Sequence, residues 1–343
     1  MTITAYATHR RYADHDLPRH PESADRIRAV WRGMEDSGLV TRVRSVDVQP
    51  LGIDEVLSVH RADYLDFLRR ISGRSSISML DADTYAGPDA LSIALLSAGG
   101  LISTVDEVLG GSANNGLAAV RPPGHHALAD RAMGFYLLGN VAIAARHVQR
   151  HHRVERVLIV DYDVHHGNGT EAMFYDDPSV LYVSTHQYPF YPSTGAVTDI
   201  GTGPGEGFTV NIPLPAGCGD THYAASFERI VWPVVERFEP QFILVSIGLD
   251  AFWGDPLAEM RLTLTGYAHL AGEVIRMADR FCGGRVVFAL EGGYNLDALR
   301  YGVGNVARQL LGESPVDPLG APPAAPEPDI DDLMSLLRKV HTL

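Results

Sequence analysis

Short apolar runs alternate along this chain with longer segments of helical periodicity, and this alternation restricts the fold more than any other feature. The runs of strand length are Gly116–Val120, Val157–Val160, Val180–Ser184, Phe208–Ile212, Phe242–Ile247 and Val286–Leu290. The helical patterns are Pro88–Leu109, Leu137–Arg150, His222–Phe238, Thr265–Phe281 and Leu296–Leu311. Because parallel strands need helical crossovers, the alternation predicts an α/β fold with a mainly parallel central sheet and helices on both faces.

The composition of the chain changes near Gly312, and this sets the predicted domain boundary. Before that point there is no internal repeat and no break in composition, so residues 1–312 are expected to form one domain. Residues 313–327 are rich in proline and alanine, which is typical of an extended linker. Residues 329–339 have the pattern of one short helix, either docked or free. We therefore expect 313–343 to be a linker with a C-terminal helix.

Charge and cysteine content argue against several classes of function. The net charge is −14 and the 28 lysines and arginines are scattered, which argues against binding to nucleic acid or to an anionic membrane surface. The same charge weakly favours a cationic substrate. Cys218 and Cys282 show no paired spacing and are expected to be reduced and buried. We find no signal-peptide pattern and no apolar run of roughly 18 residues, so a cytoplasmic location is expected. The oligomeric state is left open.

The segment Val157–Gly169 carries the strongest chemical signal in the chain. Its sequence is VLIVDYDVHHGNG, in which four apolar residues are followed at once by acids and histidines. Side chains alternate along an extended backbone, so Asp161, Asp163 and His165 point to the same side. Carboxylates at the end of a buried strand are hard to explain as packing, because they are almost never fully buried without a partner. The segment therefore indicates a metal site.

Polar groups follow three other predicted strands in the same way. Asp250 follows Phe242–Ile247, the segment Glu291–Tyr294 follows Val286–Leu290, and Arg121–His126 follows Gly116–Val120. In open α/β sheets, ligands bind beyond the carboxyl ends of the strands. Four strand ends are therefore predicted to supply side chains to one site.

Asp163, His165 and Asp250 are candidates for three metal ligands. Three protein ligands would leave a fourth position for water, which distinguishes a catalytic site from a structural one. A metal there would polarise a substrate carbonyl and lower the pKa of its bound water. The set is rich in oxygen for zinc, and ligand type alone also permits Fe²⁺ or Mn²⁺.

Two histidines and a tyrosine complete the predicted catalytic group. His126, oriented by Asn168, is interpreted as the general base and later the general acid. His125, oriented by Asp161, is expected to stay protonated, because a carboxylate partner raises the pKa of a histidine more than an amide does. Tyr294 follows two glycines at a strand end and is a candidate oxyanion donor opposite the metal.

These motifs, in this order, resemble the metal-dependent histone deacetylase and acetylpolyamine amidohydrolase superfamily, and its class II-like bacterial-type members in particular. The motifs are Arg121–His126, Asp161–Thr170, Ser246–Asp250 with Asp255-Pro256, and Leu290–Asn295. The resemblance implies a single arginase-like α/β domain. It also implies one catalytic zinc on the three candidate ligands and hydrolysis of an acetylated amine, either acetyl-lysine or a small amine such as an acetylpolyamine.

The resemblance carries over further positions. It implies that the substrate is held by Phe135 and Tyr191 in the tunnel wall, by Asp83 at the rim, and by Gly134 and Gly293. It implies a structural K⁺ or Na⁺ site formed by Asp161, Asp163, His165, Ser184 and Thr185. It implies a second, more peripheral alkali-ion site formed by Phe174, Asp177, Val180 and Phe208.

Several residues depart from the family pattern. Tyr136 stands where many relatives have cysteine, so the pocket for acetate release is expected to be partly filled. Tyr191 replaces the usual phenylalanine of the tunnel. Leu257 stands where polyamine-selective relatives tend to have glutamate, which disfavours a dedicated polyamine enzyme, although Glu259 is close by.

Two alternatives to a deacetylase are considered. A binuclear ureohydrolase of the same fold would need a second metal-binding carboxylate at position 252, where this chain has Phe252. A non-catalytic protein that binds acyl-lysine would keep the pocket without turnover. The presence of Tyr294, His126 and all three candidate ligands argues against this second alternative.

A separate histidine group lies near the end of one predicted helix. His147, His151 and His152 occur in the sequence HVQRHH, and a spacing of four residues would allow two of them to share a metal. A solvated helix face is the preferred interpretation of such a polar group.

Overall fold

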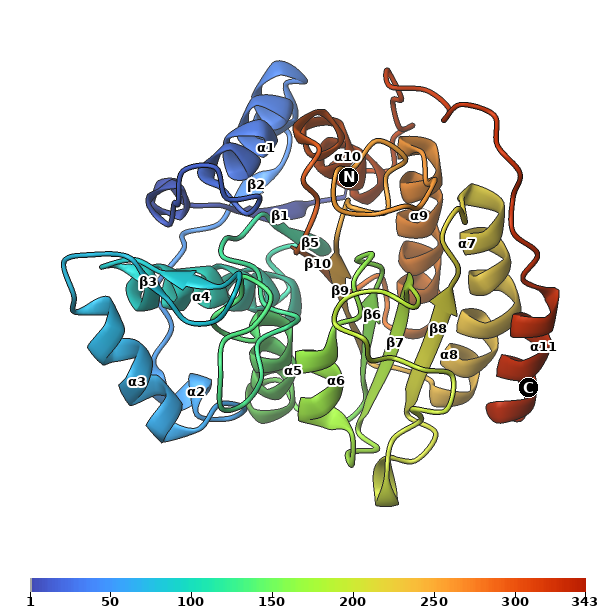
Figure 1. Ribbon diagram of the computed structural model, residues 1–343, viewed down its shortest axis with the longest axis horizontal. Helices are drawn as coiled ribbons and strands as arrows, with labels where there is room; N and C mark the ends of the chain where they lie inside the picture. The colour runs from blue at the N-terminus through green and yellow to red at the C-terminus, as the bar shows by residue number, and fades with distance from the viewer. Residues whose placement is uncertain (1) are drawn as a thin grey trace.

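The computed structural model describes residues 2–343 and has an eight-stranded parallel sheet at its centre (Figure 1). The strand order across the sheet is β2-β1-β5-β10-β9-β6-β7-β8. The strands are β1 (Thr4–Ala7), β2 (Arg44–Ser45), β5 (Asn115–Ala118), β6 (Val157–Asp161), β7 (Val180–Gln187), β8 (Thr209–Leu214), β9 (Phe242–Ile247) and β10 (Val286–Leu290). A separate antiparallel pair is formed by β3 (Ser78–Met79) and β4 (Tyr85–Ala86). The predicted single α/β domain with a parallel sheet is confirmed.

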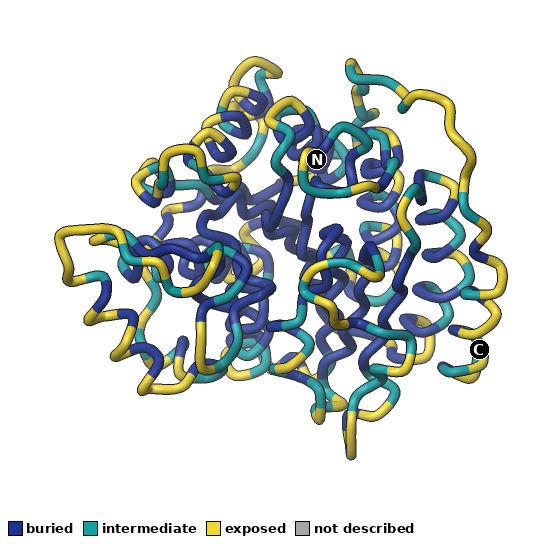
Figure 2. The backbone as a smooth tube through the Cα atoms, in the orientation of Figure 1, coloured by how far each residue is buried: buried dark blue, intermediate teal, exposed yellow. Residues whose placement is uncertain are grey.

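Helices form two groups against this sheet. The helices are α1 (Ala24–Asp36), α2 (Ile53–Val56), α3 (Ala62–Ser72), α4 (Ala90–Leu109), α5 (Asn140–His151), α6 (Asn168–Phe174), α7 (Asp220–Ser226), α8 (Trp232–Phe238), α9 (Leu264–Phe281), α10 (Leu296–Leu310) and α11 (Asp331–Val340). One group contains α4 and α5, which pack together, and the other contains α1, α9 and α10. Every residue of β5 to β10 is buried, so both faces of the sheet are covered, as Figure 2 shows in dark blue.

Helix α4 is the most apolar helix of the domain, and it packs closely on the sheet. A Cβ atom added at Gly116 of β5 would lie 2.4 Å from Cγ2 of Thr104 in α4, so the absence of a side chain permits this approach. By length and composition α4 could cross a bilayer, which corrects the expectation that no apolar run reaches that length. Its most apolar window is 72% buried inside the domain, as expected for a core helix.

The structure corrects some predicted element boundaries. The predicted helix His222–Phe238 is α7, a π-helical turn at Phe227–Val231, and α8, so its helical backbone is continuous and carries a π-helical turn just before Pro233. The first predicted strand lies at Asn115–Ala118, slightly earlier than expected. Strand β1 and helices α1 and α3 were not predicted. These elements are short or have apolar residues on one side only, so local periodicity gives a weaker signal.

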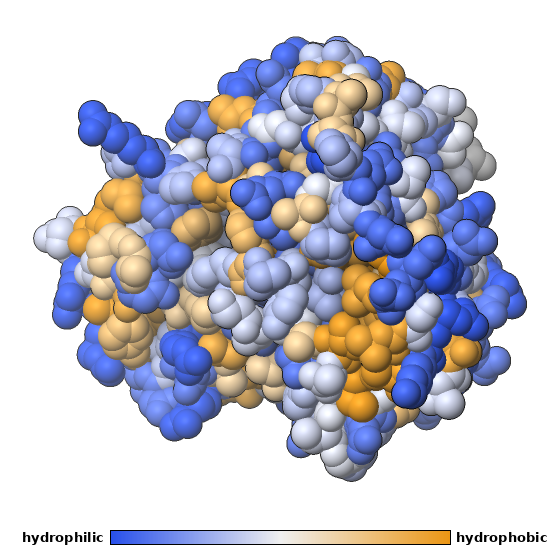
Figure 3. Space-filling model, turned by 45° about the vertical axis from the view of Figure 1, so that its right-hand side comes forward, coloured by the Kyte–Doolittle hydropathy of each residue, from blue (hydrophilic) through white to orange (hydrophobic). Residues whose placement is uncertain are grey.

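The C-terminal segment packs against the domain. The indole nitrogen of Trp253 donates to the carbonyl oxygen of Gly320 at 3.0 Å, and Nε2 of His222 lies 2.8 Å from the carbonyl oxygen of Pro328. Helix α11 buries Met334 and Leu337. Of the two arrangements left open by the sequence, the structure shows the docked one. Figure 3 shows a surface on which hydrophilic residues surround separate apolar patches, which is ordinary for a folded domain.

Protonation of buried His60 is expected to destabilise the domain in acid. Its Nε2 accepts the backbone N–H of Gly139 at the start of α5, at 2.9 Å, and burial lowers its pKa from 6.5 to about 4. The unfolded chain therefore binds this proton at a higher pH than the folded chain does. The contribution of neutral His60 to the free energy of unfolding is fully present above pH 6.5. It falls as the pH drops toward 4, and about 2 kcal/mol is lost at pH 5.

Urea denaturation at pH 7 and pH 5 measures this effect. His60→Gln keeps an acceptor and cannot be protonated, so its free energy of unfolding should fall less between the two pH values than that of the wild type. Buried His15, whose pKa burial lowers to about 3, acts in the same direction and is present in both proteins. Equal losses in both proteins would contradict the assignment to His60.

Candidate active site

The four strand ends that carry the predicted site residues are adjacent in the sheet. Strands β5, β10, β9 and β6 are neighbours in this order, and all four are parallel. Asp161 pairs in register with Ser246, and Leu290 pairs with Ile247. The polar residues that follow these strands therefore meet at one edge of the sheet, as the sequence predicts.

Asp163, His165 and Asp250 come together as a buried group of three. Nδ1 of His165 lies 3.3 Å from Oδ1 of Asp163 and 3.3 Å from Oδ2 of Asp250. Two ligand atoms about 2.1 Å from one tetrahedral zinc lie about 3.4 Å apart, so these separations suit a shared ion. Oδ2 of Asp250 is buried and has no hydrogen-bond partner among residues 2–343. The donor set therefore fits zinc.

Two glycines leave room for the carboxylates of this group. A Cβ atom at Gly292 would lie 2.2 Å from Oδ2 of Asp250, and one at Gly248 would lie 2.1 Å from Oδ2 of Asp163. Burial and the neighbouring Asp163 both raise the pKa of Asp250. Burial lowers the pKa of His165, but its two carboxylate neighbours outweigh burial and raise it to about 9. Binding of a metal must therefore displace a proton from His165.

The two histidines of the predicted pair have different partners and different pKa values. Nδ1 of His125 lies 3.0 Å from Oδ2 of Asp161, and Nδ1 of His126 lies 2.8 Å from Oδ1 of Asn168. Burial lowers the pKa of His125, but Asp161 and Asp163 outweigh it and raise that pKa to about 10. Burial and the neighbouring His125 lower the pKa of His126 well below 6.5. An amide oxygen can only accept, so His126 carries its proton on Nδ1 and leaves Nε2 free to take another.

A narrow cavity of about 210 Å³ is lined by His165 of the metal-ligand group, by His126 of the histidine pair and by Tyr294. Its walls are formed by Asp83, His126, Gly134, Phe135, His165, Phe190, Tyr191, Leu257 and Tyr294. The rings of Phe135 and Tyr294 are 6.0 Å apart, and those of His126 and Tyr191 are 5.3 Å apart. Four of the five predicted substrate-binding residues line this cavity. Gly293 does not, and its carbonyl oxygen instead accepts a hydrogen bond from Arg26.

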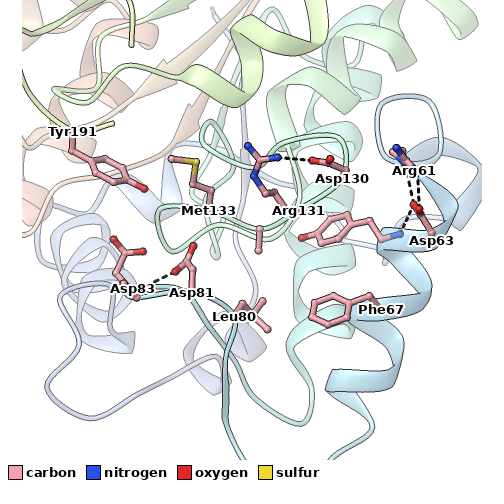
Figure 4. Close-up of a pocket in the computed structure, with 13 residues that line it drawn as sticks. Arg61, Asp63, Phe67, Leu80, Asp81, Asp83, Asp130, Arg131, Met133 and Tyr191 are labelled. Atoms are coloured by element: carbon pink, nitrogen blue, oxygen red, sulfur yellow. Dashed lines mark hydrogen bonds and ion pairs between the residues drawn. The ribbon is translucent and has the colours of Figure 1, made fainter. Parts of the chain in front are cut away.

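A wider groove of about 790 Å³ lies beside this cavity (Figure 4). The two share Asp83 and Tyr191, so they adjoin at these residues. The outer groove is lined by Arg61, Asp63, Tyr64, Phe67, Leu80, Asp81, Ala82, Asp83, Asp130, Arg131, Ala132, Met133 and Tyr191. Both of its arginines are already paired with acids, Arg61 with Asp63 and Arg131 with Asp130. Because these two pairs are neutral, the remaining acids Asp81 and Asp83 give the groove a net negative charge.

Sequence reasoning missed the carboxylates that hold the catalytic loops. Glu291 accepts the backbone N–H groups of Gly124 and His125 at 2.7 and 3.1 Å. Asp255 accepts those of Tyr294 and Asn295 at 2.7 and 3.0 Å. Burial raises the pKa of each carboxyl to about 7. Both residues were present in quoted motifs, but only the fold shows which backbone groups they meet.

A buried ion-pair group was also missed. Glu22 lies 3.0 Å from NH1 of Arg26 and 2.5 Å from Nε of Arg121, and all three side chains are at most 1% exposed. Arg26 also donates to the carbonyl oxygens of Gly293 and Glu291. Its guanidinium lies 5.0 Å from the centre of the Tyr294 ring. This group therefore connects α1 to the loop that carries Tyr294.

Two further predictions concern Tyr136 and the alkali-ion sites. Tyr136 is buried, and its ring is 5.2 Å from that of His126, but its effect on acetate release stays a prediction. The first proposed ion site lies at the carboxyl ends of β6 and β7, where Asp161 pairs with Ser184. The second lies at the opposite end of β7, where the N–H of Asp177 donates to the carbonyl oxygen of Phe174. Ion binding at both places stays a prediction.

Comparisons with known proteins identify the family of this chain. A family model for the histone deacetylase domain matches residues 20–310. Histone deacetylase 14, chloroplastic, of Arabidopsis thaliana is 42% identical over 315 residues, which cover 87% of this chain and 74% of that protein. A histone deacetylase-like amidohydrolase of Pseudomonas aeruginosa is 42% identical over 277 residues, covering 80% of this chain and 73% of that protein. The crystal structure of the HDA15 HD domain superimposes with a TM-score of 0.89 at 34% identity, covering 99% of this chain and 95% of that one. On this fold, this site and these relatives, the chain belongs to the histone deacetylase family of hydrolases.

Proposed function

We propose that this deacetylase is zinc-dependent and removes the acetyl group from acetyl-lysine in polypeptides. Asp163, His165 and Asp250 would hold the zinc ion. The observation that carries the proposal is that His165 opens into the same narrow cavity as His126 and Tyr294. When bound, zinc would polarise the acetyl carbonyl and lower the pKa of a water molecule.

The protein side chains supply the remaining chemistry. Phe135 and Tyr191 flank the lysine chain, and Tyr294 donates its hydroxyl hydrogen to the carbonyl oxygen as negative charge develops there. His126 takes a proton on Nε2 from the attacking water and then gives that proton to the leaving amine. His125 stays cationic beside Asp161 and stabilises negative charge.

The outer groove supports a polypeptide substrate over a small amine. The groove of about 790 Å³ outside the narrow cavity offers room for residues on either side of an acetyl-lysine. The acids Asp81 and Asp83 would attract cationic neighbours of that lysine. Leu257 adds an apolar surface to the wall of the narrow cavity.

Turnover by metal-stripped protein reconstituted with zinc tests the proposal. The substrates are an acetyl-lysine peptide and N-acetylputrescine, compared by kcat/KM. We expect zinc-dependent turnover with a higher kcat/KM for the peptide. A higher value for N-acetylputrescine would overturn the substrate class. No turnover of either substrate with one equivalent of zinc bound would favour the non-catalytic acyl-lysine binder.

A further inference from the structure

The histidine group at the end of α5 is built differently from a solvated helix face. His147 is only 8% exposed, which corrects the expectation that it faces solvent. Two acids reach this group from other helices, Glu55 from α2 and Asp106 from α4. Strand β6 begins shortly after α5 ends, so the group lies near the amino edge of the sheet, opposite the candidate active site.

One ring nitrogen of His147 forms a hydrogen bond, and the other has no hydrogen-bond partner in the described part of the chain. Its Nε2 lies 2.8 Å from Oδ1 of Asp106, which is a hydrogen bond. Its Nδ1 lies 3.5 Å from Oε2 of Glu55, and both of these atoms are buried with no hydrogen-bond partner in the described part of the chain. Nε2 of His151 lies 2.8 Å from the other oxygen of Glu55. Three potential ligand atoms thus lie within 4.8 Å of one another.

The separation between His147 and Glu55 suits two ligands of one metal ion better than a hydrogen bond, whereas His151 and Glu55 are at hydrogen-bond distance. Ligand atoms on one tetrahedral ion are about 3.4 Å apart, close to the separation between His147 and Glu55. A metal-binding histidine usually gives its other ring N–H to a carboxylate, and Asp106 occupies that position. His147 and His151 are four residues apart on one helix, so both rings project from the same face. Their ring centres are 4.6 Å apart.

We propose that Glu55, His147 and His151 bind a second divalent transition-metal ion, of the class of Zn²⁺ or Co²⁺, with Asp106 orienting His147. The side chain of His151 is 49% exposed and that of Glu55 is 22% exposed, so an ion can enter and water can complete its coordination. The site would join the short helix α2 to α5. It is independent of the candidate catalytic ligands, and neither its binding nor its test depends on deacetylation.

Metal content after equilibrium dialysis tests this site. The parent protein is Asp250→Ala, which weakens the candidate catalytic site, stripped with a chelator and dialysed against Zn²⁺ at pH 7.5. Adding His151→Ala should lower the bound zinc by one equivalent. Adding His152→Ala removes a neighbouring histidine whose Nε2 lies 2.7 Å from Oδ1 of Asp106 and which is not one of the three proposed ligands, so the zinc content should stay unchanged. Because His151 is half exposed, its truncation should not disturb folding, and circular dichroism checks this.

The outcomes distinguish the possible ligand sets. Unchanged zinc content in the His151→Ala variant overturns the proposal and leaves the cluster as ion pairs only. A loss of zinc in the His152→Ala variant but not in the His151→Ala variant would place the ion on Asp106, His147 and His152 instead. Equal losses in both variants also overturn the proposal, because His152 is not one of its three ligands. His151→Ala in the otherwise wild-type chain should keep its deacetylase activity, so failure of the proposed catalytic function would be seen separately.

Discussion

Replacing Tyr294 with phenylalanine is expected to lower kcat by about 10²–10³. The variant loses the hydroxyl group of a side chain that lines the narrow cavity together with His126 and His165. That hydroxyl would meet charge that is present only in the transition state, so the loss should appear in kcat more than in KM. Steady-state kinetics on an acetyl-lysine peptide, together with zinc content, measure the effect.

Tyr191→Phe is the matched control for this variant. It removes the hydroxyl of another tyrosine that lines the same cavity. Its kcat should stay close to that of the wild type. An unchanged kcat in the Tyr294→Phe variant would contradict the role of Tyr294 as oxyanion donor. An equal loss of kcat in both variants would show that loss of any hydroxyl from the cavity lowers kcat, and that the effect is not specific to Tyr294.

Replacing Glu22 with glutamine is expected to lower the free energy of unfolding by about 3–5 kcal/mol. Glutamine keeps the size of the side chain but leaves Arg26 and Arg121 as buried cations without their counterion. Burial raises the pKa of Glu22, but the two arginines outweigh burial and lower it, so the carboxylate is charged at neutral pH. Urea denaturation at pH 7 measures the change.

Asp25→Asn is the control for the buried group. Asp25 is the neighbouring acid of α1 and pairs with Arg28 at 3.0 Å, but both of these side chains are about half exposed. Exposed pairs contribute roughly 0–1 kcal/mol, so this variant should unfold almost like the wild type. Similar losses of unfolding free energy in the two variants would show that burial does not determine how much Glu22 contributes to stability.

The sequence alone was enough to predict strands β5 to β10 of the sheet and the edge at which the candidate site residues meet. The run Val157–Val160 is followed directly by Asp161, Asp163 and His165, and in the structure these residues follow one buried strand at the edge where β5, β9 and β10 also end. Such local patterns are informative because strand periodicity and the direction of parallel strands together determine where each polar residue emerges. The ends of the elements were less well predicted, since helix and strand termini depend on capping contacts.

Only the tertiary structure decided which distant groups meet. Arg26 donates to Gly293, 267 residues away, and no periodic pattern links these positions. His147 was predicted to face solvent because its own segment is polar, whereas Glu55 and Asp106 reach it from two other helices. Local sequence determines which residues form a strand or helix and which side they face. The partner of a buried charge depends on how those elements pack. Burial removes a charged side chain from water, so the charge is stable only where the fold places a polar or oppositely charged group beside it.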